Sequence, residues 1–334
     1  QLGAIIGGMA LQGRDKLTLV TSPSLSSFGL WVEQLIAEST GKEGRGIIPV
    51  VGEPIAPSEC YGQDRVFVYL CREGDHNDEV DMAMLEIEAV GHPVVRLVLH
   101  DIYDLGREFY RWEFATAVAG AVMGIHPFNQ PDVEGTKLIT RKMVEQYGAG
   151  RSVATQSPVM KHAYDSGELG LHAPGVYGRG LLRLLPDEPT MTDALRAHLS
   201  QVRTGDYVAL LAYVEWCEPY RRIVEKLRQG IRASTGVATT VGFGPRFLHS
   251  TGQIHKGGPQ NGLYLVFSCA DVVDVQVPGE SYSFGQLKAA QLLADEDMLT
   301  RRKRRYLRLH VDGDVGDGLI ACSGLFDEAL DQLD

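Results

Sequence analysis

Two stretches of this chain repeat the same order of elements, and the repetition limits the folds open to it. The first stretch runs from Asp15 to Pro54 and the second from Gly205 to Pro245. Each shows a strand pattern, an amphipathic helix pattern, a Ser-Thr-Gly turn, a second strand pattern, and then Gly and Pro opening a loop. The identity between them is modest, and the alternative is chance similarity between two α/β units. We interpret the stretches as two copies of one supersecondary unit.

Strand and helix patterns alternate in both halves of the chain. The segment from Leu25 to Ala37 has apolar residues at the i, i+3, i+4, i+7 spacing of a helix. Further helix patterns cover 77–90, 108–122, 223–228 and 284–299, and strand patterns cover 17–20, 47–51, 66–70, 94–100, 207–213, 237–241, 263–267 and 306–311. Such alternation predicts an α/β fold with doubly wound parallel sheets. We expect one α/β domain over 1–147, an irregular connector over 148–204, and a second α/β copy over 205–334.

Composition excludes several classes of protein. The 334 residues are 44% hydrophobic and 22% charged, which is ordinary for a soluble globular protein. The net charge of −11 argues against nucleic-acid binding, which needs a basic face. No apolar run approaches the ~20 residues that span a bilayer. The five cysteines are scattered without metal-ligand spacing, so we expect reduced thiols, no metal site, no membrane association and a cytoplasmic location.

Acid and base side chains are divided between the two copies. Only the first copy has an acid before its turn, Glu38, and only the second has histidines in its loop, His249 and His255. A carboxylate at the end of an apolar helix is partly desolvated, which raises its pKa and suits a general base. The alternative for Glu38 is a solvated helix-end glutamate. The division between copies predicts one shared chemical site.

Two further segments carry candidate site residues. Gln130, Glu134 and Lys137 fall at relative positions 0, +4 and +7, which places them on one face of a helix beginning near Pro131 or Asp132. The alternative is an exposed face with a Glu–Lys pair. The Gly-rich loop 246–262 lies between two strands, where polar groups could bind phosphate or hydroxyls and the histidines could transfer protons near neutral pH. The alternative there is a solvated loop.

Three segments resemble the isomerase part of the bifunctional transaldolase/glucose-6-phosphate isomerase proteins. Ala37 to Gly44 (AESTGKEG) resembles the family's Glu-Ser-(Asn/Thr)-Gly-Lys motif. Pro127 to Lys137 (PFNQPDVEGTK) resembles its Gln, Glu and Lys signature, and Leu248 to Gln253 (LHSTGQ) resembles the His-Ser-x-Gly-Gln element of bacterial members. The resemblance implies two doubly wound units of the sugar-isomerase (SIS) type.

The resemblance also implies an activity and roles for residues. The family interconverts glucose 6-phosphate and fructose 6-phosphate through a cis-enediol, without a metal or organic cofactor. Carried over by motif, Glu38 would move a proton between substrate C2 and C1, and Lys137 and His249 would assist ring opening. Substrate contacts would come from the remaining motif residues: Gln130, Ser39, Thr40, Lys42, Ser250, Thr251, Gln253 and His255. His255 replaces His249 if the loop register differs.

The chain departs from the family pattern in two ways. The family's histidine follows the glutamate closely, but the loop 51–67 contains none. In dimeric members that histidine comes from the neighbouring subunit, so we predict that the second copy replaces the neighbour. The upstream phosphate-binding domain and the transaldolase part have no counterpart here, which suggests a carboxyl-terminal fragment. Its expected partners are a hexose 6-phosphate, the upstream domain and a second copy of the chain.

Two other functions stay open at this point. The chain could be a non-catalytic sugar-phosphate-binding or regulatory module, in which case ligand binding would survive Glu38→Gln. The second copy could instead serve only as an interaction surface that completes an oligomer.

Overall fold

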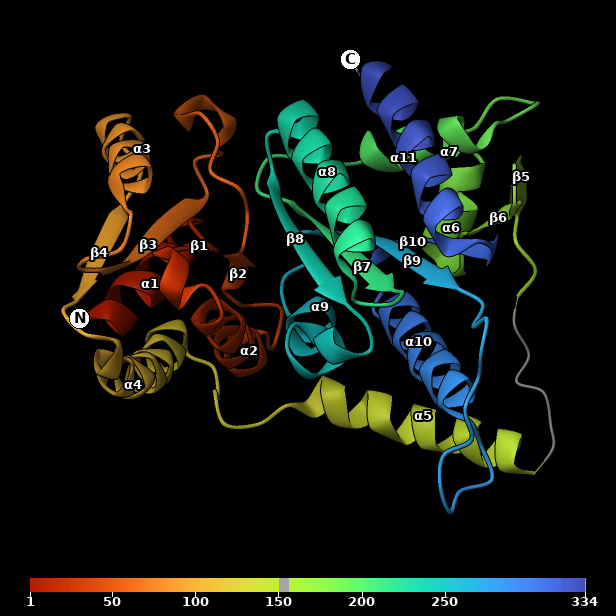
Figure 1. The fold of residues 1–334 in the computed structure, drawn as a ribbon, viewed down its shortest axis with the longest axis horizontal. Coiled ribbons are helices and arrows are strands. Elements are labelled where there is room, and N and C mark those ends of the chain that lie inside the picture. Colours follow the sequence, from red (N-terminus) through yellow and green to blue (C-terminus); the bar gives the residue numbers. More distant parts are fainter. Residues whose placement is uncertain (150–155, 334) are drawn as a thin grey trace.

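The computed structural model describes residues 1–149 and 156–333, and it contains two sheets with helices packed around them (Figure 1). The first half holds α1 (Leu2–Leu11), β1 (Lys16–Thr21), α2 (Phe28–Thr40), β2 (Ile48–Val51), β3 (Arg65–Arg72), α3 (Asp78–Ala89), β4 (Val94–Leu99), α4 (Leu105–Met123) and α5 (Pro131–Gly148). The second half holds β5 (Met160–Tyr164), β6 (Gly167–His172), α6 (Gly175–Leu182), α7 (Met191–Leu199), β7 (Tyr207–Tyr213), α8 (Glu218–Thr235), β8 (Ala238–Phe243), α9 (Gly252–Gly257), β9 (Gly262–Cys269), α10 (Phe284–Arg301), β10 (Arg305–Gly313) and α11 (Val315–Asp331).

The first sheet is fully parallel, in the order β2-β1-β3-β4. Successive residues of its central strands point to opposite faces, so each strand contributes to two cores. Leu17 and Leu19 of β1 pack with α1, α2 and α4, whereas Phe67 and Tyr69 of β3 pack with α3 on the other face. Pro49 lies within β2, the edge strand of this sheet. An edge strand pairs on one side only, so it tolerates the missing N–H of a proline.

The second sheet has six strands in the order β5-β6-β10-β9-β7-β8. Its strands β10, β9, β7 and β8 are parallel, and the antiparallel hairpin β5–β6 extends the sheet beside β10. Helices α6, α7, α8 and α11 bury one face of this sheet, and α9 and α10 pack on the other. Helices on both faces of both sheets confirm the predicted α/β, doubly wound architecture.

The parallel parts of the two sheets share one strand order. The order β2-β1-β3-β4 of the first sheet corresponds to β8-β7-β9-β10 of the second. In both, the strand before the repeated helix lies second from the edge and the strand after that helix lies at the edge. This shared topology supports the interpretation of the two stretches as copies of one unit.

Edge strands β2 and β8 lie next to each other and join the two halves. Glu53, which follows β2, is 1% exposed and accepts hydrogen bonds from Arg65 at 2.9 and 3.1 Å. Its carboxylate also accepts from the hydroxyl of Thr239 in β8, at 3.0 Å. Burial alone would raise the pKa of Glu53, but Arg65, Arg228 and Arg232 hold it below its usual range. The junction is therefore a buried, charge-compensated contact.

Helix α5 follows the first half in sequence but packs on the second. It crosses below α9 and α10, and it contacts α10 extensively (Figure 1). The predicted domain boundary at residue 147 assigns α5 to the first half, whereas its most extensive contacts are with α10 in the second half. The division of the chain into domains stays a prediction.

The structure corrects the prediction that residues 148–204 form an irregular connector. Within 156–204 the chain forms the β5–β6 hairpin and helices α6 and α7, while 150–155 lie outside the described residues. Leu169 and Leu171 alternate into the core along β6. Thr190 and Asp193 form a capping box at the start of α7. The strands in this segment are short and lie among Gly and Pro residues, so the sequence pattern did not indicate them.

Three other features bear on the sequence predictions. None of the helices within 1–149 and 156–333 is long and apolar enough to cross a membrane. No cluster of His, Cys, Asp or Glu in these same ranges is arranged to hold a metal ion. All five cysteines are free thiols.

Candidate functional site

Glu38 lies in the last turn of α2, on the side that faces the second half of the molecule. Val32, Ile36 and Ala37 of this helix are buried, and they fix its orientation on the first sheet. Burial raises the pKa of the half-buried Glu38 carboxyl. A hydrogen bond from Gln34 at 3.2 Å and electrostatic attraction to His249, Lys137 and Lys42 partly oppose that rise. The raised pKa of Glu38 is the property that we expect of a general base.

The turn after Glu38 is held by its own polar side chains. The buried Thr40 hydroxyl donates to the Ile36 carbonyl at 2.7 Å and accepts from the Ile47 amide at 3.0 Å. Lys42 is buried, and its ammonium donates to the carbonyls of Ser39 at 3.0 Å and His126 at 2.9 Å. Burial lowers the pKa of Lys42 to about 8, although Glu38 raises it. Thr40 and Lys42 therefore shape the turn, and half-buried Ser39 lies beside Glu38.

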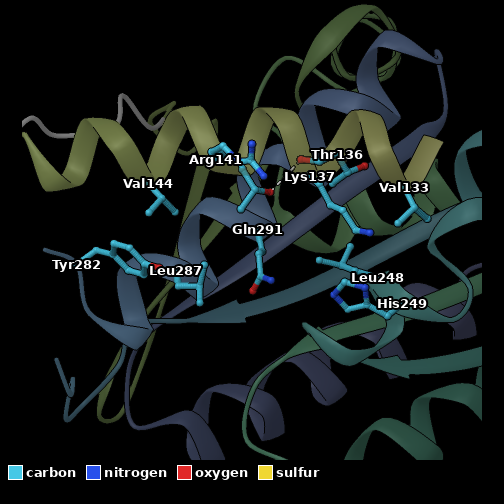
Figure 2. Close-up of a pocket in the computed structure, with 11 residues that line it drawn as sticks. Val133, Thr136, Lys137, Arg141, Val144, Leu248, His249, Tyr282, Leu287 and Gln291 are labelled. Carbon is cyan, nitrogen blue, oxygen red and sulfur yellow. Dashed lines mark hydrogen bonds between the residues drawn. The ribbon is translucent and has the colours of Figure 1, made fainter. Parts of the chain in front are cut away.

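Helix α5 presents Lys137 to the same region. The helix begins at Pro131, as predicted, because proline fits a first helical position. The ammonium of Lys137 is 2.8 Å from the Glu134 carboxylate in an exposed pair. Figure 2 shows Lys137 reaching from α5 towards His249. Gln130 stands at the N-cap without a side-chain capping bond, outside the cavity described below.

The loop after β8 places its two histidines very differently. His249 ends the short 3-10 helix η4 (Arg246–His249), and it is exposed. His255 lies in α9 and is 2% exposed, against Tyr207, Phe247 and Tyr264. Burial lowers its pKa well below the usual range, so it stays neutral inside the core. Of the two alternatives left open by the sequence, the geometry favours His249.

The other loop candidates are buried. Ser250 and Thr251 are 2% and 6% exposed, and the Ser250 hydroxyl donates to the Phe247 carbonyl at 3.4 Å. Neither residue lines the cavity next to His249.

Gln253 connects the three segments that carry Glu38, Lys137 and His249. Its side-chain oxygen accepts from the amides of Asp132 at 3.0 Å and Val133 at 3.4 Å, and its amide group donates to the carbonyl of Gly41 at 2.8 Å and to Asp132 Oδ2 at 2.9 Å. The first amides of a helix have no partner within the helix. Gln253 thus caps α5 from 121 residues away while it holds the end of α2. Its amide is fully engaged and wholly buried.

A cavity of about 260 Å³ lies between α5, η4 and α10 (Figure 2). Lys137 and His249 line it, and both act electrostatically on Glu38, although Glu38 is not itself a lining residue. The structure thus brings together the three residues predicted to be catalytic, from three separate segments. The other lining residues are Val133, Thr136, Thr140, Arg141, Val144, Leu248, Tyr282, Leu287 and Gln291.

Sequence reasoning missed the far end of this cavity. Arg141 follows Lys137 by four residues on α5, so the helical period that grouped Gln130, Glu134 and Lys137 could have included it. Tyr282 and Gln291 come from the loop before α10 and from α10 itself, and no local pattern relates them to α5. Their proximity is a product of the tertiary fold.

Comparison with known proteins finds a partial similarity to glucose-6-phosphate isomerases. No family model matches the chain. A glucose-6-phosphate isomerase of Leptospira biflexa is 29% identical over 171 residues, covering 40% of this chain and 38% of that protein. Those of Lactiplantibacillus plantarum and Pediococcus pentosaceus are 27% and 31% identical, each over 34% of both chains. The chain thus spans well under half the length of these relatives.

Similar solved structures add little. A hypothetical protein of Thermus thermophilus has a TM-score of 0.32 at 14% identity, covering 99% of this chain and 81% of that one. The C-terminal domain of glucosamine-fructose-6-phosphate aminotransferase from Francisella tularensis has a TM-score of 0.25 at 8% identity, covering 97% and 84%. With TM-scores below 0.5, neither likeness supports a statement about fold or function.

Proposed function

We propose that this chain contributes the catalytic base and the ring-opening groups of an aldose–ketose isomerase that interconverts glucose 6-phosphate and fructose 6-phosphate. The observation that carries the proposal is that His249 and Lys137, which line one cavity, both act electrostatically on Glu38. These residues come from α2, η4 and α5, and each lies in a motif that resembles the isomerases. The similarity of the chain to glucose-6-phosphate isomerases supports the same function.

The proposed chemistry begins with ring opening. A proton leaves the anomeric hydroxyl and another reaches the ring oxygen, with His249 and Lys137 exchanging these protons with the sugar. Glu38 then removes the C2 proton of the open-chain aldose while the carbonyl oxygen O1 gains a proton, which gives the cis-enediol. Return of the proton from Glu38 to C1, with loss of the O2 proton, gives the ketose. Electrons move only within the substrate, so the reaction needs no external oxidant or reductant.

In this proposal the second copy supplies the histidine that the first copy lacks. The loop 51–67 has no histidine, and His249 of the second copy reaches the neighbourhood of Glu38 instead. In this arrangement a single chain would combine groups from two units in one site. The fusion to transaldolase, the upstream phosphate-binding domain, self-association and a cytoplasmic location remain predictions.

The test is a coupled assay of fructose 6-phosphate conversion by the 334-residue chain, together with NMR of the exchange of the C2 proton of glucose 6-phosphate with solvent deuterium. We expect Glu38→Gln to abolish conversion and exchange, and His249→Ala to slow conversion of the cyclic sugar. Glu88→Gln is the matched control, because Glu88 is 50% exposed on α3 in a pair with Arg96. Full activity of Glu38→Gln would refute the role of this carboxyl. Tight binding that survives Glu38→Gln, without any exchange, would favour the non-catalytic binding module.

A further inference from the structure

The charged side chains that line the cavity between α5 and α10 are all positive. The cations Lys137 and Arg141 line it, and none of the residues along its wall carries a carboxylate. This is notable in a chain with a net charge of −11. A concave site lined by cations attracts anions and raises their local concentration. The lining therefore indicates an anionic ligand.

The cavity has two different ends. In Figure 2 it runs along α5, with Val133, Leu248 and His249 at one end and Val144 and Tyr282 at the other. The groups that act electrostatically on Glu38 include His249 and Lys137, so the carboxyl adjoins the first end. Arg141 lies one helical turn beyond Lys137, about 6 Å along the axis. An anion at Arg141 is thus held away from the carboxylate that would repel it.

Hydrogen-bond donors surround the second end. Arg141 offers a planar guanidinium, whose paired N–H groups match the oxygens of a phosphoryl group. The Tyr282 hydroxyl and the Gln291 amide line the same cavity, and neither makes a hydrogen bond to another described residue. Val144 and Leu287 add apolar wall beside them. The apolar wall limits solvent screening, which strengthens the attraction between charges.

We propose that Arg141, Tyr282 and Gln291 form a phosphoryl-binding subsite on this chain. The assignment of a sugar to the remainder of the cavity rests on the proposed function. A sugar phosphate then lies along α5 with its phosphoryl group at Arg141 and its reacting carbons near Glu38. The chain would hold the phosphoryl group itself, without the upstream domain.

Calorimetric binding of inorganic phosphate, fructose 6-phosphate, fructose and gluconate to the full chain tests this subsite. We expect fructose 6-phosphate to bind more tightly than fructose or gluconate, and Arg141→Gln to weaken its binding and that of phosphate by about 10- to 100-fold. Lys142→Gln is the matched control, because Lys142 is an exposed cation of the same helix outside the cavity, and we expect less than a twofold change. Thermal unfolding of both variants checks that they are folded.

The outcomes separate the subsite from the isomerase. An equal effect of Arg141→Gln and Lys142→Gln on phosphate binding would overturn the subsite, as would gluconate binding as tightly as fructose 6-phosphate. Arg141-dependent binding in a chain that shows no proton exchange would support the subsite and count against the isomerase. Isomerase activity whose KM is unchanged by Arg141→Gln would support the isomerase and overturn the subsite.

Discussion

Replacement of Gln253 by Met removes the side-chain amide that joins α9, the end of α2 and the start of α5. The substitution keeps the approximate size of the side chain but leaves the Gly41 carbonyl and the amides of Asp132 and Val133 without their partner. An unpaired buried backbone group costs about 1–3 kcal/mol. With three such groups, one of them in a long 3.4 Å contact, we expect the free energy of unfolding to fall by roughly 3–6 kcal/mol.

The measurement is urea unfolding followed by circular dichroism, with the linear dependence on urea giving each free energy. Gln260→Met is the control, because the exposed Gln260 makes a single hydrogen bond to the Arg302 carbonyl at 3.0 Å. We expect this control to lose less than about 1 kcal/mol.

Gln253→Glu sharpens the test. The new carboxylate would face Asp132 Oδ2 and the Gly41 carbonyl, which now accept from the Gln253 amide at 2.9 and 2.8 Å. A buried like-charge contact raises the proton affinity of the introduced acid. This variant should therefore be destabilised at neutral pH and recover stability as the pH falls, because the protonated acid can donate again. A Gln253→Met variant within about 1 kcal/mol of the wild type would refute the clamp and leave substrate contact as the role of this residue.

Three further outcomes follow from the structure. Lys137→Met should lower kcat by about 10²–10⁴-fold. It should also move the acidic limb of the pH–rate profile to higher pH, because loss of the Lys137 cation raises the pKa of Glu38 further; an unmoved limb would contradict the electrostatic interaction of Lys137 with Glu38. Burial lowers the pKa of His198 to about 3, so below about pH 6.5 this residue takes up a proton on unfolding. It should contribute about 2 kcal/mol to the loss of stability between pH 7 and 5, and urea titrations of His198→Phe should lack that contribution. Gly41→Ala should cost about 1–3 kcal/mol in the same titrations, because a Cβ there meets the backbone of Ile254; unchanged stability would show that α9 yields freely.

The sheet strands and the longer helices follow from local sequence. Runs such as Tyr207 to Tyr213 are apolar throughout because parallel strands are buried on both faces, and the predicted bounds of β7 are confirmed. Helix α5 begins where Pro131 predicts it. Helix α11 was missed because the stretch from Asp312 to Gly318 resembles a turn, whereas Asp314 caps the helix by accepting from the Asp317 amide.

The site was only partly readable in the sequence. Motif spacing proposed Glu38, Lys137 and His249 as site residues, but it could not separate residues that face the cavity from buried residues that support it. Gln253 and His255 belong to the second kind, since each is buried among partners that come from distant segments. Such pairings depend on tertiary packing and leave no periodic trace along the chain.

The shared strand order of the two sheets has a consequence for ligand stoichiometry. Two identical units would present two equivalent meeting places for an acid and a histidine. In this chain the position before the Ser-Thr-Gly turn is Glu38 on α2 but Ala233 on α8, and only the loop after β8 carries histidines. Under the proposed function, each chain therefore saturates with one equivalent of sugar phosphate. The second unit, which has Ala233 in place of the acid, then serves as structural support and is constrained at the site only by the position of His249.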